Sequence, residues 1–257
     1  MANTGFETAV CVLASIVVIS DADVQHLVAD LFRVRVPTAM AYALNCYLWL
    51  GPDGVTVVDT GWADSTPVIA RALELLGRRT SDVERIVLSH FHDDHVGSAA
   101  AMAKWSPSIV VAGRADTPFI RGTEPGPWPT LTAAEQALNP PMPGTVAPPP
   151  PCRVDHEADD GDVLDFAGGA VVLHVGGHTP GSIALHLPRL GVLLTGDLVA
   201  ESRGNVIVGP FNIDRDQSRR SISRLAGTGA RIAGFGHGEA VTSDAAQRLA
   251  HCSDPLA

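Results

Sequence analysis

The sequence predicts an α/β fold, because apolar runs of strand length alternate with segments of helical composition. Two strand-like runs in residues 45–61 are joined by a Gly-Pro-Asp-Gly turn, and a helix is expected over residues 66–77. A strand is then expected at residues 85–89, a helical segment at 95–105 and another strand at 108–113. This order favours strands and helices in one α/β unit.

The ends of several predicted elements carry their own signals. Thr66 is a good N-cap for the first helix, Pro67 fits the first helical position and Gly77 can end it. Ser243 is expected to cap a last helix. The second half of the chain has strand patterns at 162–166, 170–175, 182–187, 191–196 and 230–235, and a helical pattern at 216–225.

The middle of the chain is rich in proline. Residues 118–151 hold eleven of the nineteen prolines, which remove backbone donors and stop helices. We interpret residues 1–257 as one domain with a Pro-rich insertion at about 114–151, carrying at most a short helix near 132–138. The alternative is a disordered linker between two domains. Trp128, Leu131, Leu138 and Met142 would give the insertion an apolar wall for a substrate, and the alternative is a spacer without substrate contact.

Composition limits the partners. The net charge of −10 argues against a nucleic-acid partner. Four scattered cysteines form no CxxC pair, so we expect a reducing, cytoplasmic location. The run Ala9 to Ile19 is too short to span a membrane and is interpreted as an early strand, so no membrane partner is expected. The one basic cluster is interpreted as the solvated face of a helix: Arg215, Arg219, Arg220 and Arg224.

The segment LSHFHDDHVG, residues 88–97, crowds potential metal ligands at the end of an apolar run. Because alternate residues of a strand share a face, His90 and His92 can point to the same side. The following turn can bring Asp94 and His95 around. Imidazole and carboxylate together suit zinc, iron or manganese, whereas the alternative is a solvated polar loop.

Three further candidates follow strand-like runs and adjoin glycines, so that each can project from a tight turn. They are His178 in GGHTPGS, Asp197 in TGD and His237 in FGH. Each would be a weak signal alone. Their occurrence together after the first motif favours a shared metal centre.

These segments, together with VVDTG at residues 57–61, resemble the motifs of the metallo-β-lactamase-fold hydrolases, which include glyoxalase II and lactonase-like bacterial enzymes. The resemblance implies an αββα sandwich of two mixed β-sheets flanked by helices, with metals at one edge. It also implies a binuclear centre of two Zn²⁺, with iron or manganese as alternatives. His90, His92 and His178 would hold one metal, Asp94, His95 and His237 the other, and Asp197 would bridge both. Asp59 would support a ligand from beneath.

The resemblance implies a hydrolase of small molecules, in which a hydroxide shared by two metals attacks the carbonyl of an ester, lactone or thioester. Asp94 would be the catalytic residue that carries a proton to the leaving group. The chain has no G-x-S-x-G nucleophile motif. Two other functions stay open: a mononuclear iron sulfur dioxygenase of the same fold, and a metal-bearing binding protein without turnover.

The substrate is less well defined by the resemblance. Hydroxyacylglutathione hydrolases use basic and tyrosine side chains near their C-terminus, whereas the single lysine here is Lys104 and both tyrosines lie early, at Tyr42 and Tyr47. Acyl-homoserine lactonases commonly have a tyrosine between the TGD aspartate and the last histidine, but residues 198–236 contain none. The sequence leaves the substrate and the oligomeric state undecided.

Overall fold

The computed structural model describes residues 20, 23–37, 44–138 and 149–257. A mixed sheet of seven strands has parallel pairing from β4 to β7 and antiparallel pairing from β1 to β4. Its strands are β1 (Val24–Val28), β2 (Leu31–Val36), β3 (Leu44–Leu50), β4 (Val55–Val58), β5 (Val83–Leu88), β6 (Ile109–Gly113) and β7 (His156–Ala158).

A second mixed sheet has the order β14-β11-β10-β9-β8, in which only β11 and β14 pair in parallel. Its strands are β8 (Val163–Leu164), β9 (Ala170–His174), β10 (Ile183–Leu187), β11 (Val192–Leu194) and β14 (Ile232–Gly234). A separate two-stranded hairpin consists of β12 (Val199–Ser202) and β13 (Asn205–Val208).

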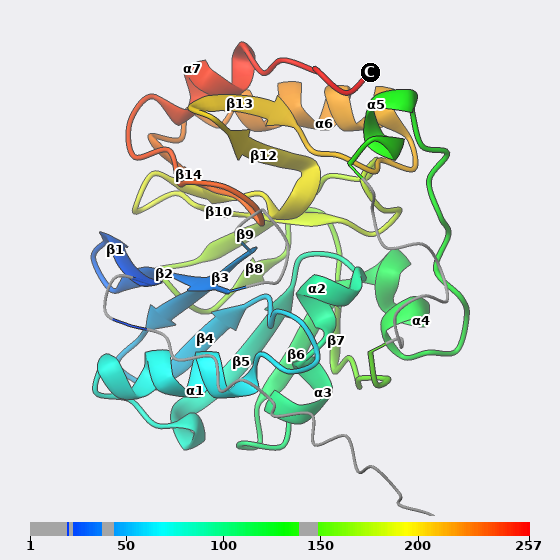
Figure 1. Ribbon diagram of the computed structural model, residues 1–257. Helices are drawn as coiled ribbons and strands as arrows, with labels where there is room; N and C mark the ends of the chain where they lie inside the picture. Colours follow the sequence, from blue (N-terminus) through cyan, green and yellow to red (C-terminus); the bar gives the residue numbers. More distant parts are fainter. Residues whose placement is uncertain (1–19, 21–22, 38–43, 139–148) are drawn as a thin grey trace, which may run out of the picture.

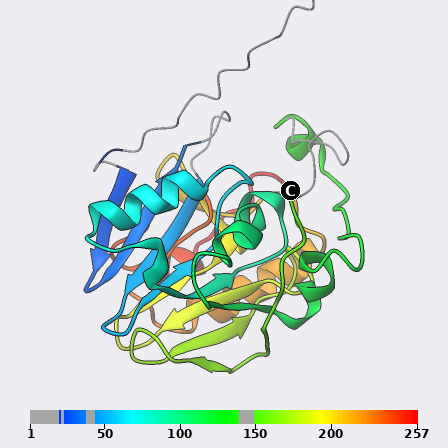
Figure 2. The same cartoon turned by 90° about the horizontal axis from the view of Figure 1, so that it is seen from below.

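Helices lie outside both sheets (Figures 1 and 2). They are α1 (Thr66–Leu75), α2 (Asp93–Val96), α3 (Ala99–Met102), α4 (Thr117–Ile120), α5 (Ala133–Gln136), α6 (Arg215–Ala226) and α7 (Ala245–Ala250), with 3₁₀ turns η2 (Thr80–Asp82), η3 (Arg114–Asp116) and η4 (Gly196–Leu198). None of the helices in the described part of the chain is long and apolar enough to cross a membrane.

Three apolar layers hold this arrangement together. The first packs α1 and α3 against the seven-stranded sheet, the second fills the space between the sheets, and the third packs α6 and α7 against the five-stranded sheet. Successive side chains of a strand point to opposite faces of its sheet, so one strand contributes to two apolar layers. In β10, Ile183 and Leu185 face the other sheet while Ala184 faces the helices. The predicted αββα sandwich of two mixed sheets is confirmed.

Two expected helix starts and one expected helical segment differ from the structure. Ser65, not Thr66, occupies the N-cap of α1, and Asp244, not Ser243, precedes α7. The segment expected as one helix at 95–105 forms α2 and α3 instead. Between them, Ser98 contacts the loop before α1, where its hydroxyl oxygen accepts a hydrogen bond from the Ser65 N–H at 3.1 Å.

The solvated arginine face expected on α6 is only partly correct. Arg215 is largely buried and forms ion pairs with Glu135 and Asp254. Arg219 also pairs with Asp254, at 2.7 Å. The expected early strand at 9–19 lies outside the described residues.

The Pro-rich insertion leaves the seven-stranded sheet after β6 and returns to it as β7. The predicted short helix is confirmed as α5, with Thr132 as its N-cap: Thr132 Oγ1 accepts a hydrogen bond from the Glu135 N–H at 3.1 Å. From α4 to α5 the chain runs along the side of the sandwich and ends beside α6 (Figure 1). The insertion thus connects the two halves of the sandwich.

Candidate metal centre

All seven predicted ligands lie where strands end. β5 leads into His90 and His92, while α2 carries Asp94 and His95. In the second sheet, His178, Asp197 and His237 follow β9, β11 and β14. The structure brings these side chains into two adjoining groups, here called the three-histidine cluster (His90, His92 and His178) and the mixed cluster (Asp94, His95, Asp197 and His237).

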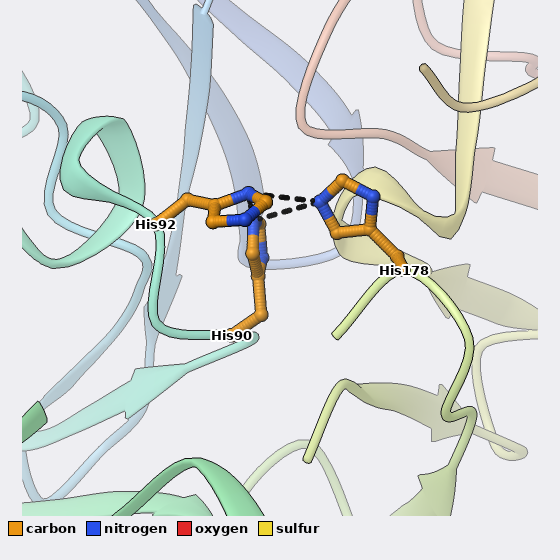
Figure 3. Close-up of side chains that lie close together, drawn as sticks. All are labelled: His90, His92 and His178. Atoms are coloured by element: carbon orange, nitrogen blue, oxygen red, sulfur yellow. Dashed lines mark hydrogen bonds between the residues drawn. The ribbon is translucent and has the colours of Figure 1, made fainter. Parts of the chain in front are cut away.

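The three-histidine cluster joins residues 88 positions apart in the sequence (Figure 3). His178 Nε2 lies 3.2 Å from His90 Nε2 and 3.0 Å from His92 Nδ1. The distance between His90 Nε2 and His92 Nδ1 is 3.1 Å. Three ring nitrogens therefore face one another.

The mixed cluster pairs imidazoles with carboxylates. His237 Nε2 lies 3.2 Å from Asp94 Oδ2 and 3.1 Å from Asp197 Oδ2. His95 Nε2 lies 3.3 Å from Asp197 Oδ1, and neither of these two buried atoms has a hydrogen-bond partner among the described residues. Both atoms are thus available as ligands. The bridging role of Asp197 stays a prediction.

The donor atoms fit metal ions. Zinc–nitrogen bonds of about 2.0–2.1 Å in tetrahedral geometry separate two ligand nitrogens by about 3.3 Å. The separations of 3.0–3.2 Å in the three-histidine cluster lie close to this value. Imidazole and carboxylate donors suit zinc, iron and manganese alike, so the arrangement supports divalent metal binding without selecting one metal.

Electrostatics differ between the clusters. Burial lowers the pKa of His92 to about 4 and that of His178 to about 3, so both are neutral and available for a metal at pH 7. Burial also lowers the pKa of His237, but Asp197 and Asp94 raise it more, to about 10. Burial raises the pKa of Asp94, yet His95 and His237 bring it down to about 2. The mixed cluster therefore balances its own charges.

Asp59 supports both clusters from beneath. Its Oδ2 accepts hydrogen bonds from His95 Nδ1 at 2.9 Å and from Ser89 Oγ at 2.8 Å. Because the Ser89 hydroxyl donates its one hydrogen to Asp59, its oxygen accepts from His90 Nδ1, 2.9 Å away. Nε2 of each histidine is thereby left to bind a metal, as expected of a group that orients ligands. The sequence did not indicate Ser89.

Hydrogen bonds from the first sheet hold the loop that carries His237. Asn45 Nδ2 donates to the Phe235 oxygen at 3.0 Å, and Tyr47 Oη donates to the same oxygen at 2.7 Å. A side chain on Gly236 would place its Cβ 1.9 Å from Asp197 Oδ1, so only glycine allows this close approach. Asn45 and Tyr47 were missed because nothing in a strand sequence shows which distant loop it will face.

Asp116, at the end of η3, was also missed. It accepts hydrogen bonds from the Phe91 N–H and from Thr179 Oγ1, which belong to the two loops of the three-histidine cluster. A signal was available, because Asp116 follows β6, the parallel neighbour of β5, and the carboxyl ends of parallel strands meet at one sheet edge.

The insertion contacts the first sheet side of the site at Phe91 and the second sheet side at Phe211. A Cβ on Gly126 would lie 2.2 Å from the Phe91 ring, so the insertion backbone packs against the residue between His90 and His92. Farther along, Glu135 Oε1 accepts a hydrogen bond from the Phe211 N–H at 2.7 Å. Trp128, between these two attachments, is 47% exposed. Met142 lies outside the described residues.

Comparisons with known proteins agree with this geometry. The family model of the metallo-beta-lactamase superfamily matches residues 41–237. An uncharacterised Bacillus subtilis protein, YobT, is 25% identical over 79% of this chain and 86% of its own length. A hydroxyacylglutathione hydrolase from Rhodobacter capsulatus is 30% identical over 59% of this chain, and the match spans only 46%, about half, of that relative.

The solved structures show the same fold. The crystal structure of a metallo-beta-lactamase family protein from Thermus thermophilus superposes with a TM-score of 0.67 and 28% identity. The superposition covers 88% of this chain and 79% of that one. Sequence and structure comparisons thus point to one group of proteins.

Proposed function

Because the chain belongs to the metallo-β-lactamase superfamily, we propose that it is a binuclear metal-dependent hydrolase that cleaves a small ester, lactone or thioester. The observation that carries the proposal is the pair of adjoining donor clusters at one end of the sandwich. A mononuclear enzyme would need only one such cluster. The hydrolases among the relatives give further support.

The two clusters would hold the metals as the motifs predict. His90, His92 and His178 would hold one ion, and Asp94, His95 and His237 the other, with Asp197 between them. Divalent zinc bound there would make water nucleophilic near neutral pH and polarise the carbonyl under attack.

Asp94 is the proposed proton carrier. Its pKa of about 2 keeps its carboxylate ionised at pH 7, as a metal ligand requires. Its side chain is 16% exposed, more than those of His95, Asp197 and His237 in the same cluster. This position would let it carry the proton of the attacking hydroxide from the tetrahedral intermediate to the leaving oxygen or sulfur.

The insertion is proposed to form one wall of the substrate site. Its contact with Phe91 fixes one end, and the hydrogen bond from Phe211 to Glu135 fixes the other. The Ile213 N–H donates to the His178 oxygen at 3.2 Å, so the second attachment adjoins a predicted ligand. Trp128 would offer this wall an apolar surface for an acyl chain or aromatic group.

Hydrolysis assays test this function. Protein stripped of metal and then loaded with Zn²⁺ should cleave at least one member of a panel of esters, lactones and acyl thioesters. The activity should disappear with a chelator and return with Zn²⁺. A loaded protein with two metals that cleaves no member of the panel would reject the proposed reaction.

A further inference from the structure

Asp116 is buried beside the predicted metal ligands without being one of them. Its exposed fraction is 0%, and among the described residues it forms no salt bridge with lysine or arginine. Burying an unpaired carboxylate is costly unless hydrogen bonds satisfy it. A neutral residue would serve packing alone at lower cost, so the charged group needs another explanation.

Three hydrogen bonds satisfy the carboxylate of Asp116. Its Oδ2 accepts from the Phe91 N–H at 3.0 Å and from Thr179 Oγ1 at 2.6 Å. Its Oδ1 accepts from the Gly181 N–H at 2.6 Å. Phe91 separates His90 from His92, and Thr179 follows His178. One side chain therefore joins the two loops that supply the three-histidine cluster.

The GHTPGS segment is shaped to receive this carboxylate. A Cβ on Gly181 would lie 2.2 Å from the Asp116 nitrogen, so glycine is required for the approach. Ser182 Oγ accepts a hydrogen bond from the Thr179 N–H at 3.0 Å and lies 2.6 Å from Thr179 Oγ1. Because the Thr179 hydroxyl donates its hydrogen to Asp116, Ser182 donates to Thr179. Thr179, Gly181 and Ser182 thus act together on Asp116.

We propose that Asp116 is a positioning residue that holds the two loops of the three-histidine cluster in the arrangement that binds a metal ion. The inference rests on the proposed metal-dependent function. A backbone hydrogen bond also joins the two loops, from the Ile183 N–H to the Ser89 oxygen at 2.9 Å. That bond lies at the strand ends, whereas Asp116 reaches the residues that adjoin the ligands.

Zinc affinity tests the proposal independently of catalysis. In Asp116→Asn, the side-chain amide must place a donor where the carboxylate accepts, so the three hydrogen bonds cannot all form. Competition between the protein and a chromophoric chelator should show Zn²⁺ binding about 10–100-fold weaker at one of two sites. That site should be the one weakened by His92→Ala, which removes a donor of the three-histidine cluster.

Thr179 provides a matched pair of variants that keeps the side chain small. Thr179→Ser retains the hydroxyl that donates to Asp116 and should bind Zn²⁺ like wild type. Thr179→Val keeps the shape but removes the donor, and should weaken the same site by a smaller factor than Asp116→Asn. Asp155→Asn is the control, because Asp155 accepts the Val110 N–H at 2.9 Å on the strand next to Asp116 but touches neither loop.

Wild-type Zn²⁺ affinity at both sites in Asp116→Asn and Thr179→Val would overturn the proposal. If Asp116→Asn fails to fold, equal affinities for Thr179→Val and Thr179→Ser would overturn it. Weakened Zn²⁺ binding in a protein that cleaves none of the ester, lactone and thioester panel would support the positioning role and reject only the proposed reaction.

Discussion

The two donor clusters differ in what stabilises them. The three-histidine cluster gathers nitrogens with no acid among them, and burial keeps His92 and His178 neutral. In the mixed cluster, Asp94 and Asp197 pair with imidazoles. The mixed cluster can therefore hold itself together through its own charges. The three-histidine cluster has no such ion pairs within it. Its geometry therefore depends more on residues that are not ligands, such as Ser89 and Asp116.

The largest effect is expected from Asp197→Ala. If Asp197 is a ligand of both metals, this change should affect both clusters and remove the difference between them. Removing its carboxylate should lower metal content at both sites and abolish hydrolysis. Elemental analysis with hydrolysis assays measures this, and Asp216→Ala is the control because its side chain is 78% exposed on α6. Loss of a single metal, with the other site unchanged, would assign Asp197 to the mixed cluster alone.

A smaller effect is expected from Asp59→Ala. This change removes the partner of His95 Nδ1 and, through Ser89, disturbs His90, so both sites should weaken by about 10–100-fold. Zinc competition against a chelator measures the loss. Metal depletion as severe as that of Asp197→Ala would show that Asp59 does more than orient ligands.

Ser89→Ala tests whether the three-histidine cluster can be weakened without the mixed cluster. It removes the hydroxyl that orients His90 but leaves the hydrogen bond from the Ser89 N–H to Asp59, which is 2.7 Å long. Only the three-histidine cluster should weaken, by less than in Asp59→Ala. Equal weakening of both sites in the chelator titration would contradict the separate support of the clusters.

The smallest effect on metal binding is expected in the insertion. Trp128→Ala should change the preference between short and long acyl substrates while both metals remain bound. Val163→Ala is the matched control, because Val163 is an exposed apolar residue, 65% accessible, on the edge strand β8. Identical chain-length profiles for wild type and Trp128→Ala would leave the insertion as a spacer.

Local patterns in the sequence predicted which side chains gather at the strand ends because each signal is short, whereas the sandwich was implied by the resemblance to the superfamily. A strand followed by histidine and glycine places the side chain at a sheet edge wherever the strand lies. The supporting residues are different. Asn45 and Tyr47 reach the His237 loop across about 190 positions of sequence. Asp116 reaches the His178 loop at Gly181, 65 positions away. Such pairings arise only when the two sheets pack.

The sequence analysis also missed strands β1, β2, β7, β12 and β13, and the last three share a cause. β12 and β13 follow the TGD segment as a short hairpin, and β7 has only three residues. Segments of this length give too few alternations to identify a strand. The segment 95–105 was expected to be helical from its composition, whereas in the structure Gly97 and Ser98 separate α2 from α3, and Ser98 contacts Ser65. Tertiary contacts decided these features.

Metal content tests the central claim most directly. Protein purified without added metal and measured by elemental analysis should contain about two divalent ions per chain, most of them zinc. His92→Ala and His237→Ala should each lose one of these ions, because they remove a donor from different clusters. A single tightly bound iron in the wild-type protein would contradict the binuclear account and favour the sulfur dioxygenase alternative.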